Sequence, residues 1–251
     1  MTPSILRSVG FVHTHVHSAY SLREGAITVE TLVKRAKADE APAIAITDTN
    51  NLFGALEFSE KAAKAGIQPL VGAQLTLDFA DAPAGRLSTL ARAPIVLIAQ
   101  SEAGYMNLMR LVSRVWLDPG PGEEAHVRYD ALGDTDGLIA LTGGASGALD
   151  RLLAAGADDL ARARLETLAA TFGDRLYIEL QRHDPERRNE PALLDLAYTK
   201  GLPLVATNEP YFAAQSDFDA QDALLCIAEG ALLTTEPRRR LTPEHRLKTR
   251  A

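Results

Sequence analysis

The stretch AIAITDTNNLFGALEFSEKAAKAGIQPLVGAQ, residues 43–74, holds a complete strand–helix–strand unit. Residues 43–47 are rich in β-branched side chains, 52–65 have the apolar spacing of an amphipathic helix, and 69–77 form a second β-rich run. Gly66 lies where a helix-ending glycine is expected. The stretch therefore predicts two parallel strands joined by a helix.

The same alternation extends along the whole chain of 251 residues. We predict strands at 9–14, 43–47, 69–77, 94–99, 137–142, 175–180 and 203–207. Helices are predicted at 29–38, 52–65, 105–115, 157–171, 191–200 and 218–228. Because strands that alternate with helices form a parallel sheet, and α/β barrels commonly reach this length, we predict an α/β barrel.

Composition and charge exclude several classes of protein. Hydrophobic residues make up 46% and charged residues 24% of the chain, as in ordinary globular proteins, and a net charge of -7 argues against a dedicated DNA clamp. The single cysteine, Cys226, lies in an apolar stretch, which predicts a buried core side chain. With no signal segment and no run of roughly 18 apolar residues, we expect a cytoplasmic protein without membrane contact.

Basic residues gather near the C-terminal end, where Arg238, Arg239 and Arg240 are consecutive. Two interpretations stay open, a nucleic-acid contact or a solvated linker that approaches an acidic neighbour. No aromatic residues interleave with the arginines, so stacking on single-stranded nucleic acid has no support. A lone triplet of arginines favours the linker.

Polar side chains follow most of the predicted strands. In a barrel these positions lie at one mouth, where active groups collect. On the first strand, three histidines occupy alternate residues, so their imidazoles are expected to point the same way, as metal ligands on a strand do. The polar residues are His13, His15, His17, Asp48, Thr49, Gln74, Glu179, Gln181, His183, Asn208 and Glu209, and the glycines Gly143 and Gly144 follow the fifth strand at the same mouth.

Some of these residues also have simpler interpretations. Asp48 either takes part in chemistry or hydrogen-bonds backbone amides in its turn. Gly143 and Gly144 either cradle a phosphate or form a tight strand-to-helix turn, and the missing P-loop lysine favours the turn. His183 precedes Asp184-Pro185 in a loop, which favours a solvent-exposed side chain.

Four segments resemble the PHP (polymerase and histidinol phosphatase) family, specifically the N-terminal PHP domains of bacterial replicative DNA polymerase alpha subunits. They are FVHTHVHSAYSLREGA at 11–26, the stretch 43–74, AGYMNLMRLVS at 103–113 and GLPLVATNEPYF at 201–212. The resemblance implies a distorted seven-stranded (β/α) barrel over residues 5–233. Residues 234–251 are then expected to be a connector toward a polymerase palm that lies beyond them.

The resemblance also implies where metal ligands would lie, because metal-competent members hold a trinuclear cluster with nine ligands. His15 and His17 match the first ligand pair. The other positions depart from the family pattern: Glu24 replaces an aspartate, Thr49 a histidine, Gln74 a glutamate, Pro94 a histidine, Gly144 a cysteine, and Glu209 with Tyr211 an Asp-x-His pair. These nine positions are interpreted as a vestigial metal site, with His13, Asp48 and Asn208 as further residues of the mouth.

The replacements remove donors that a metal cluster needs. Proline and glycine have no side-chain donor, threonine is a poor ligand, and an amide lacks the charge of a carboxylate. We therefore expect no metal and no catalytic residue in this domain. One zinc or manganese ion held weakly by His15, His17, Glu24 and Glu209 is the weaker alternative.

The expected function follows from the resemblance. It implies a catalytically inactive domain of a DNA-directed DNA polymerase, a nucleotidyltransferase of DNA replication, serving as a structural and docking platform for the separate epsilon proofreading exonuclease. The parent enzyme is expected to bind DNA and Mg²⁺, with catalytic carboxylates beyond residue 251. The fragment alone should therefore not extend a primer. The alternative is a metal-dependent phosphoesterase or 3′-5′ exonuclease acting in this domain.

Overall fold

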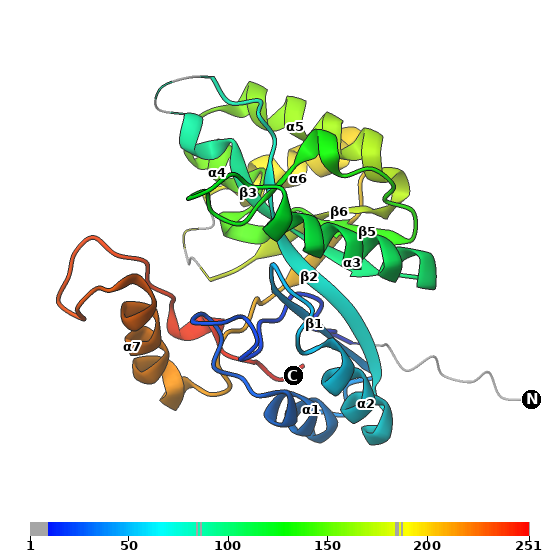
Figure 1. Cartoon of the computed structure of the whole chain (residues 1–251), viewed down its shortest axis with the longest axis vertical. Helices are drawn as coiled ribbons and strands as arrows, with labels where there is room; N and C mark the ends of the chain where they lie inside the picture. Colours follow the sequence, from blue (N-terminus) through cyan, green and yellow to red (C-terminus); the bar gives the residue numbers. More distant parts are fainter. Residues whose placement is uncertain (1–9, 84, 86, 184–185, 187, 251) are drawn as a thin grey trace, which may run out of the picture.

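The structure is a computed structural model that describes residues 10–83, 85, 87–183, 186 and 188–250. Residues 5–9 of the predicted domain and residue 251 lie outside the described residues. One curled sheet, in the order β1-β2-β3-β5-β6-β7 with β4 beside β2, runs through the molecule (Figure 1). Its strands are β1 Ala43–Thr49, β2 Gln68–Asp78, β3 Arg92–Ala99, β4 Val127–Arg128, β5 Leu138–Leu141, β6 Leu176–Gln181 and β7 Leu204–Thr207.

Strand β3 breaks the parallel arrangement, because it runs antiparallel to both β2 and β5. The prediction of a wholly parallel sheet is therefore wrong. A parallel strand needs a crossover, usually a helix, whereas the described residues between β2 and β3 form only the 3₁₀ turn Ser88–Leu90. The reversal places Pro94, which pairs with Thr76, at the same end of the sheet as the carboxyl end of β2.

The described part of the predicted first strand, from residue 10, is not a regular strand, so that prediction is also wrong. The segment does run along β1, since Ala45 donates its amide to His13 O at 2.8 Å and Thr47 to Val16 O at 2.9 Å. The step of two residues from Ala45 to Thr47 in β1 therefore faces a step of three residues, from His13 to Val16, in the segment. The extra residue acts as a bulge and breaks the alternation between His13 and His15.

The helices agree closely with the sequence pattern. Thr28 caps the first helix, since its side chain accepts from the Thr31 amide, and Gly66 ends the second at a φ of 80°. The five-residue α4 was not predicted. The helices are α1 Val29–Ala38, α2 Ala55–Ala65, α3 Glu102–Leu117, α4 Asp150–Ala154, α5 Asp158–Phe172, α6 Glu190–Lys200 and α7 Phe218–Glu229.

The core has two main parts. The larger packs α3, α5 and α6 against β2, β3, β5 and β6, and the smaller packs α1 and α2 against β1. Leu247, from the end of the chain, belongs to the smaller part, and Cys226 is buried as predicted. No helix among the described residues is both long enough and apolar enough to span a bilayer.

The irregular segment 13–17 closes the gap between the two ends of the sheet. On one side it bonds to β1, and on the other His17 donates its amide to Pro210 O at 3.0 Å, just after β7. The sheet is thus a curled half-barrel completed by an irregular segment, which confirms the predicted distorted α/β barrel. This closure brings the two histidines at 15 and 17 beside the residues that follow β7.

Candidate functional site

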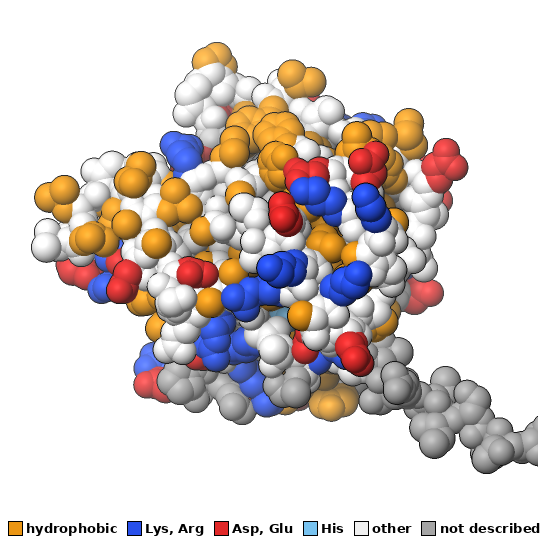
Figure 2. All heavy atoms as spheres, turned by 90° about the horizontal axis from the view of Figure 1, so that it is seen from below, with side chains coloured by type: hydrophobic (Ala, Val, Ile, Leu, Met, Phe, Trp, Pro, Cys, Tyr) orange, Lys and Arg blue, Asp and Glu red, His pale blue; other side chains and the backbone are white. Residues whose placement is uncertain are grey.

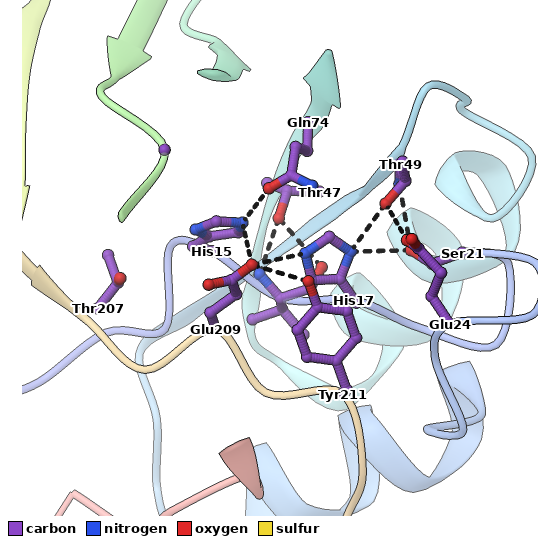
Figure 3. Close-up of polar contacts among 12 residues, drawn as sticks. His15, His17, Ser21, Glu24, Thr47, Thr49, Gln74, Thr207, Glu209 and Tyr211 are labelled. Carbon is purple, nitrogen blue, oxygen red and sulfur yellow. Dashed lines mark hydrogen bonds and ion pairs between the residues drawn. The ribbon is translucent and has the colours of Figure 1, made fainter. Parts of the chain in front are cut away.

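His15 lies at the centre of the barrel mouth and is fully buried. Its Nδ1 lies 2.7 Å from Glu179 Oε1. Figure 3 shows its other two partners: Gln74 Oε1 lies 2.9 Å and Glu209 Oε1 3.7 Å from Nε2. Burial lowers the pKa of His15, but the carboxylates of Glu179 and Glu209 outweigh it and raise the pKa to about 9. His15 is therefore an imidazolium that donates from both nitrogens.

Glu179 is a fully buried carboxylate at the end of β6 that joins several parts of the mouth. Its Oε1 accepts from His15, from the Thr207 hydroxyl and from Gln181 Nε2, while its Oε2 accepts from the Gly143 amide at 3.0 Å. Glu179 was expected at the mouth, but not among the metal-site positions. Its pairing with His15, 164 residues away, makes it the organising anion of the site.

Glu209 and Tyr211, on the loop after β7, form the other wall of the mouth. Glu209 Oε1 accepts from the Tyr211 hydroxyl at 2.8 Å and lies 3.6 Å from His17 Nε2, while the Tyr211 ring stacks on His17 at 4.2 Å. Burial raises the pKa of Glu209, but His15 and His17 outweigh it and hold the pKa well below its usual range. Glu209 is therefore a buried anion facing two imidazoles.

Glu24 and Thr49 lie at the outer edge of the mouth. Glu24 Oε2 accepts from the Thr49 hydroxyl at 2.6 Å, and Glu24 Oε1 accepts from Arg239 Nη1 at 2.7 Å. Burial raises the pKa of Glu24, but Arg239 and His17 outweigh it and lower the pKa. Arg239 was not among the predicted site residues, because only its position in a basic triplet marked it.

Two further predicted residues hold backbone segments in place. Asp48 accepts from the Ser18 amide at 2.6 Å and from the hydroxyls of Ser18 and Ser21, at 2.8 and 2.7 Å. Asp48 thus binds a backbone amide, but of the segment that carries the histidines, 30 residues earlier, and not of its own turn. Asn208 donates to two carbonyls of the C-terminal end, Glu244 O at 3.2 Å and Arg246 O at 2.7 Å.

His13 lies apart from the other two histidines of the segment. Its Nε2 lies 2.9 Å from Lys248 O, and its ring lines a separate cavity of about 190 Å³ with Asp39 and Leu247. The expectation that all three imidazoles point the same way is therefore wrong for His13. The physical reason is the extra residue between positions 13 and 16, which reverses the face of the chain.

Gly143 and Gly144 form a tight turn that packs against Pro94 of β3, since a Cβ on Gly143 would lie 2.3 Å from Pro94 O. A Cβ on Gly144, whose φ is 60°, would lie 2.2 Å from the side chain of Gln181. The Gln181 amide thus fills the space of a side chain at 144, accepts from the Ala145 amide at 3.1 Å, and donates to Glu209 at 2.9 Å. The glycine pair therefore makes the tight turn that the sequence favoured, with Gln181 packed into it.

A second histidine pair borders Glu209. His183 and His245 stack with ring centroids 3.7 Å apart, and with Glu209 they form a group whose donor atoms lie within 4.8 Å of one another. His183 is buried, so the expected solvent exposure is wrong, and burial with the His245 neighbour lowers its pKa to about 4. Because the rings are nearly parallel, at 14°, one ion cannot lie in both ring planes.

Comparison with known proteins places these observations in a family. A model of the PHP domain matches residues 13–183. The chain belongs to the PHP domain family. A solved structure described as an amidohydrolase from Chromobacterium violaceum aligns with 80% of this PHP domain and 87% of its own chain. The TM-score is 0.51 at 17% identity, so this likeness shows the fold alone.

Two curated relatives of this PHP domain carry the same name. DNA polymerase III subunit alpha of Caulobacter vibrioides is 45% identical over 243 residues, which is 95% of this chain and 21% of the relative. The subunit of the same name from Treponema pallidum is 38% identical over 229 residues, 87% of this chain and 19% of the relative. The chain thus spans about a fifth of the length of these relatives.

The donors of this PHP domain do not fit a cluster of metal ions. His15, His17 and Glu209 form a group within reach of a single ion. However, both nitrogens of His15 face oxygen acceptors, and Gln181 fills the space at position 144. A cluster of divalent cations needs several carboxylates free to ligate, whereas Glu179 and Glu209 here accept hydrogen bonds from protein donors.

Proposed function

We propose that this PHP domain is the N-terminal domain of a bacterial DNA polymerase III subunit alpha. On this proposal it is catalytically inactive in itself, resides in the cytoplasm, and serves as a structural and docking platform for the epsilon proofreading exonuclease. The observation that carries the proposal is the 45% identity, over 95% of this chain, to a relative of that name. DNA and Mg²⁺ are then bound by the polymerase part of the parent chain.

The inactivity is supported by the chemistry of the mouth. Hydrolysis of a phosphoester by bridged metals requires a hydroxide and a clamp for the phosphate oxygens, both supplied by the ions. Here the anions Glu179 and Glu209 are neutralised by protein donors, first among them the imidazolium of His15. The carboxylates of Glu179 and Glu209 are therefore balanced by groups of the protein itself.

A docking role is supported by an apolar hollow beside the mouth. Leu22, Phe53 and Trp116 line a cavity of about 490 Å³ next to Glu24, and the three side chains are 62%, 62% and 59% exposed. The Trp116 indole is held in place by its bond to Asn50 O at 2.7 Å. Rigid, exposed aromatic side chains are typical anchors of protein interfaces. We assign this hollow to the exonuclease.

A second apolar surface fits contact with the rest of a polymerase chain. Hydrophobic side chains gather over α7 and the loop that follows it (Figure 2). Ile227, Leu232 and Leu233 are 77%, 72% and 56% exposed there. Because clustered exposed apolar side chains mark interaction sites, this surface supports packing against a further domain.

The docking proposal predicts that the chain and its cognate proofreading exonuclease elute together in size-exclusion chromatography. Trp116→Ala is expected to weaken the complex about 30-fold, as loss of an anchor worth about 2 kcal/mol does. Tyr198→Ala is the matched control, because Tyr198 is an aromatic residue of α6 that is 77% exposed away from the hollow. Separate elution, or equal effects of the two variants, contradicts the proposed surface.

A second candidate function is a metal-dependent phosphoesterase or 3′-5′ exonuclease. It is favoured by the group His15, His17 and Glu209, whose ligand atoms lie close enough together to hold one metal ion. We expect substoichiometric metal after purification without chelator, and no hydrolysis of a phosphodiester or of single-stranded DNA with Mn²⁺ or Zn²⁺. Elemental analysis and a nuclease assay measure both. Stoichiometric metal, with hydrolysis that disappears when His15 and His17 are both replaced by alanine, would establish the phosphoesterase instead.

A further inference from the structure

The C-terminal arm, residues 234–250, folds back onto the mouth. Tyr211 donates its amide to His245 O at 2.9 Å, and Leu247 donates to Phe212 O at 2.9 Å, so the arm pairs with the loop that carries Glu209. Asn208 adds a side-chain bond to Arg246 O at 2.7 Å. The arm is therefore bonded directly to the wall of the site.

The end of the arm is anchored in the smaller core. The Lys248 carbonyl lies 2.9 Å from His13 Nε2, and Arg250 donates its amide to Asp39 Oδ2 at 2.9 Å. Leu247 is 7% exposed and packs with the residues of α1 and α2. These contacts hold the arm to segments that lie more than 200 residues earlier in the chain.

The start of the arm places the guanidinium of Arg239 at the mouth. Arg238 forms a bidentate pair with Asp222 of α7, with both contacts at 2.6 Å, which fixes the chain just before Arg239. Arg239 then reaches Glu24 at 2.7 Å and lies over the Tyr211 ring, 5.9 Å from its centroid. The basic triplet thus contacts acidic and aromatic residues of its own domain.

The charges of the mouth explain why a cation belongs there. Glu24, Glu179 and Glu209 place three carboxylates around two imidazoles, and His15 contacts only the inner two. Glu24, the outer carboxylate, forms its ion pair with Arg239. We propose that the former metal mouth is now a socket for the C-terminal arm, with Arg239 as the cation that completes it.

This inference rests on the proposed absence of a catalytic metal, but not on docking of the exonuclease. On this view the mouth sets the path of residues 234–250 across the domain. The geometry of the old site and the path of the arm are then energetically coupled, because each supplies charges and hydrogen bonds that the other needs.

Arg239→Gln in the 251-residue chain tests the socket. We expect a fall in melting temperature of about 2–4 °C, the shift that loss of one modest interaction gives in a chain of this size. Hydrogen exchange at the amides of Tyr211 and Leu247, which pair the arm with the site, should speed up about tenfold. Arg240→Gln is the matched control, because Arg240 pairs with the exposed Glu236 at 3.1 Å and, more distantly, with Asp222 at 4.0 Å, neither of which is a carboxylate of the mouth.

A double variant separates the contact from a general effect of charge. If Arg239 acts through Glu24, then Arg239→Gln should add nothing to Glu24→Gln in melting temperature or in exchange. Additive effects, or exchange rates equal to those of Arg240→Gln, overturn the socket and leave the proposed inactivity intact. Stoichiometric binding of Mn²⁺ by the unaltered chain, measured by calorimetry, would overturn both the socket and the proposed inactivity.

Discussion

Replacement of Glu179 by alanine is expected to lower the free energy of unfolding by about 3–5 kcal/mol, because it removes the nearer of the two carboxylates that pair with the buried His15 and leaves only Glu209, 3.7 Å away. Glu179 Oε1 and His15 Nδ1 are 2.7 Å apart and neither side chain is exposed. The Gly143 amide and the Thr207 hydroxyl lose their acceptor in the same variant.

Urea unfolding followed by circular dichroism measures this loss. Glu166→Ala is the matched control, since Glu166 forms an ion pair of similar length, 2.6 Å to Lys200, with 54% of its side chain exposed. Solvent screens such a pair, so that variant should unfold almost as the parent does. Equal midpoints for the two variants would show that Glu179 does not organise the mouth.

Asp150→Asn is expected to stabilise the domain in a pH-dependent way. Burial, with a smaller contribution from Glu179, raises the pKa of Asp150 to about 7 from an ordinary value of 3.8. The folded state then binds a proton that the unfolded state has lost, so stability falls as pH rises from about 4 to about 7. Asparagine carries no charge and removes this penalty, which reaches about 4 kcal/mol above pH 7 for a shift of about three units.

The gain of Asp150→Asn should therefore be small at pH 4, grow up to pH 7 and stay constant above it. Melting temperatures measured across this range test the trend. Asp158→Asn is the matched control, because Asp158 is likewise the first residue of its helix but is exposed to solvent. A gain that is the same at every pH would contradict the burial penalty.

Local pattern was sufficient to predict most of the elements. Apolar spacing located α1 at its observed bounds, and glycines at 66 and 201 end their helices with positive φ as expected. Strand direction was not predictable in the same way. Alternation of strands and helices implied parallel pairing, but β3 returns without a crossover helix, and only the observed pairing reveals this reversal.

The candidate site, like the fold, was predicted only in part from the sequence. The motif positions located His15, His17 and Glu209, which the fold brings together. The partners that satisfy them, Glu179 and Gln181, were noticed only as polar residues at a strand end. Glu179 lies 164 residues from His15 and Gln181 lies 28 residues from Glu209, so no local spacing encodes either pairing.

By itself, the sequence determined the α/β class, the resemblance to PHP domains and the loss of several metal donors, because these depend on residue type and short spacing. Only the tertiary structure decided what replaced those donors. An imidazolium at His15, an amide from Gln181 and a guanidinium from Arg239 contact the carboxylates of Glu179, Glu209 and Glu24. The physical reason is that burying a charge requires a partner of opposite charge, and folding alone determines which distant residue supplies it.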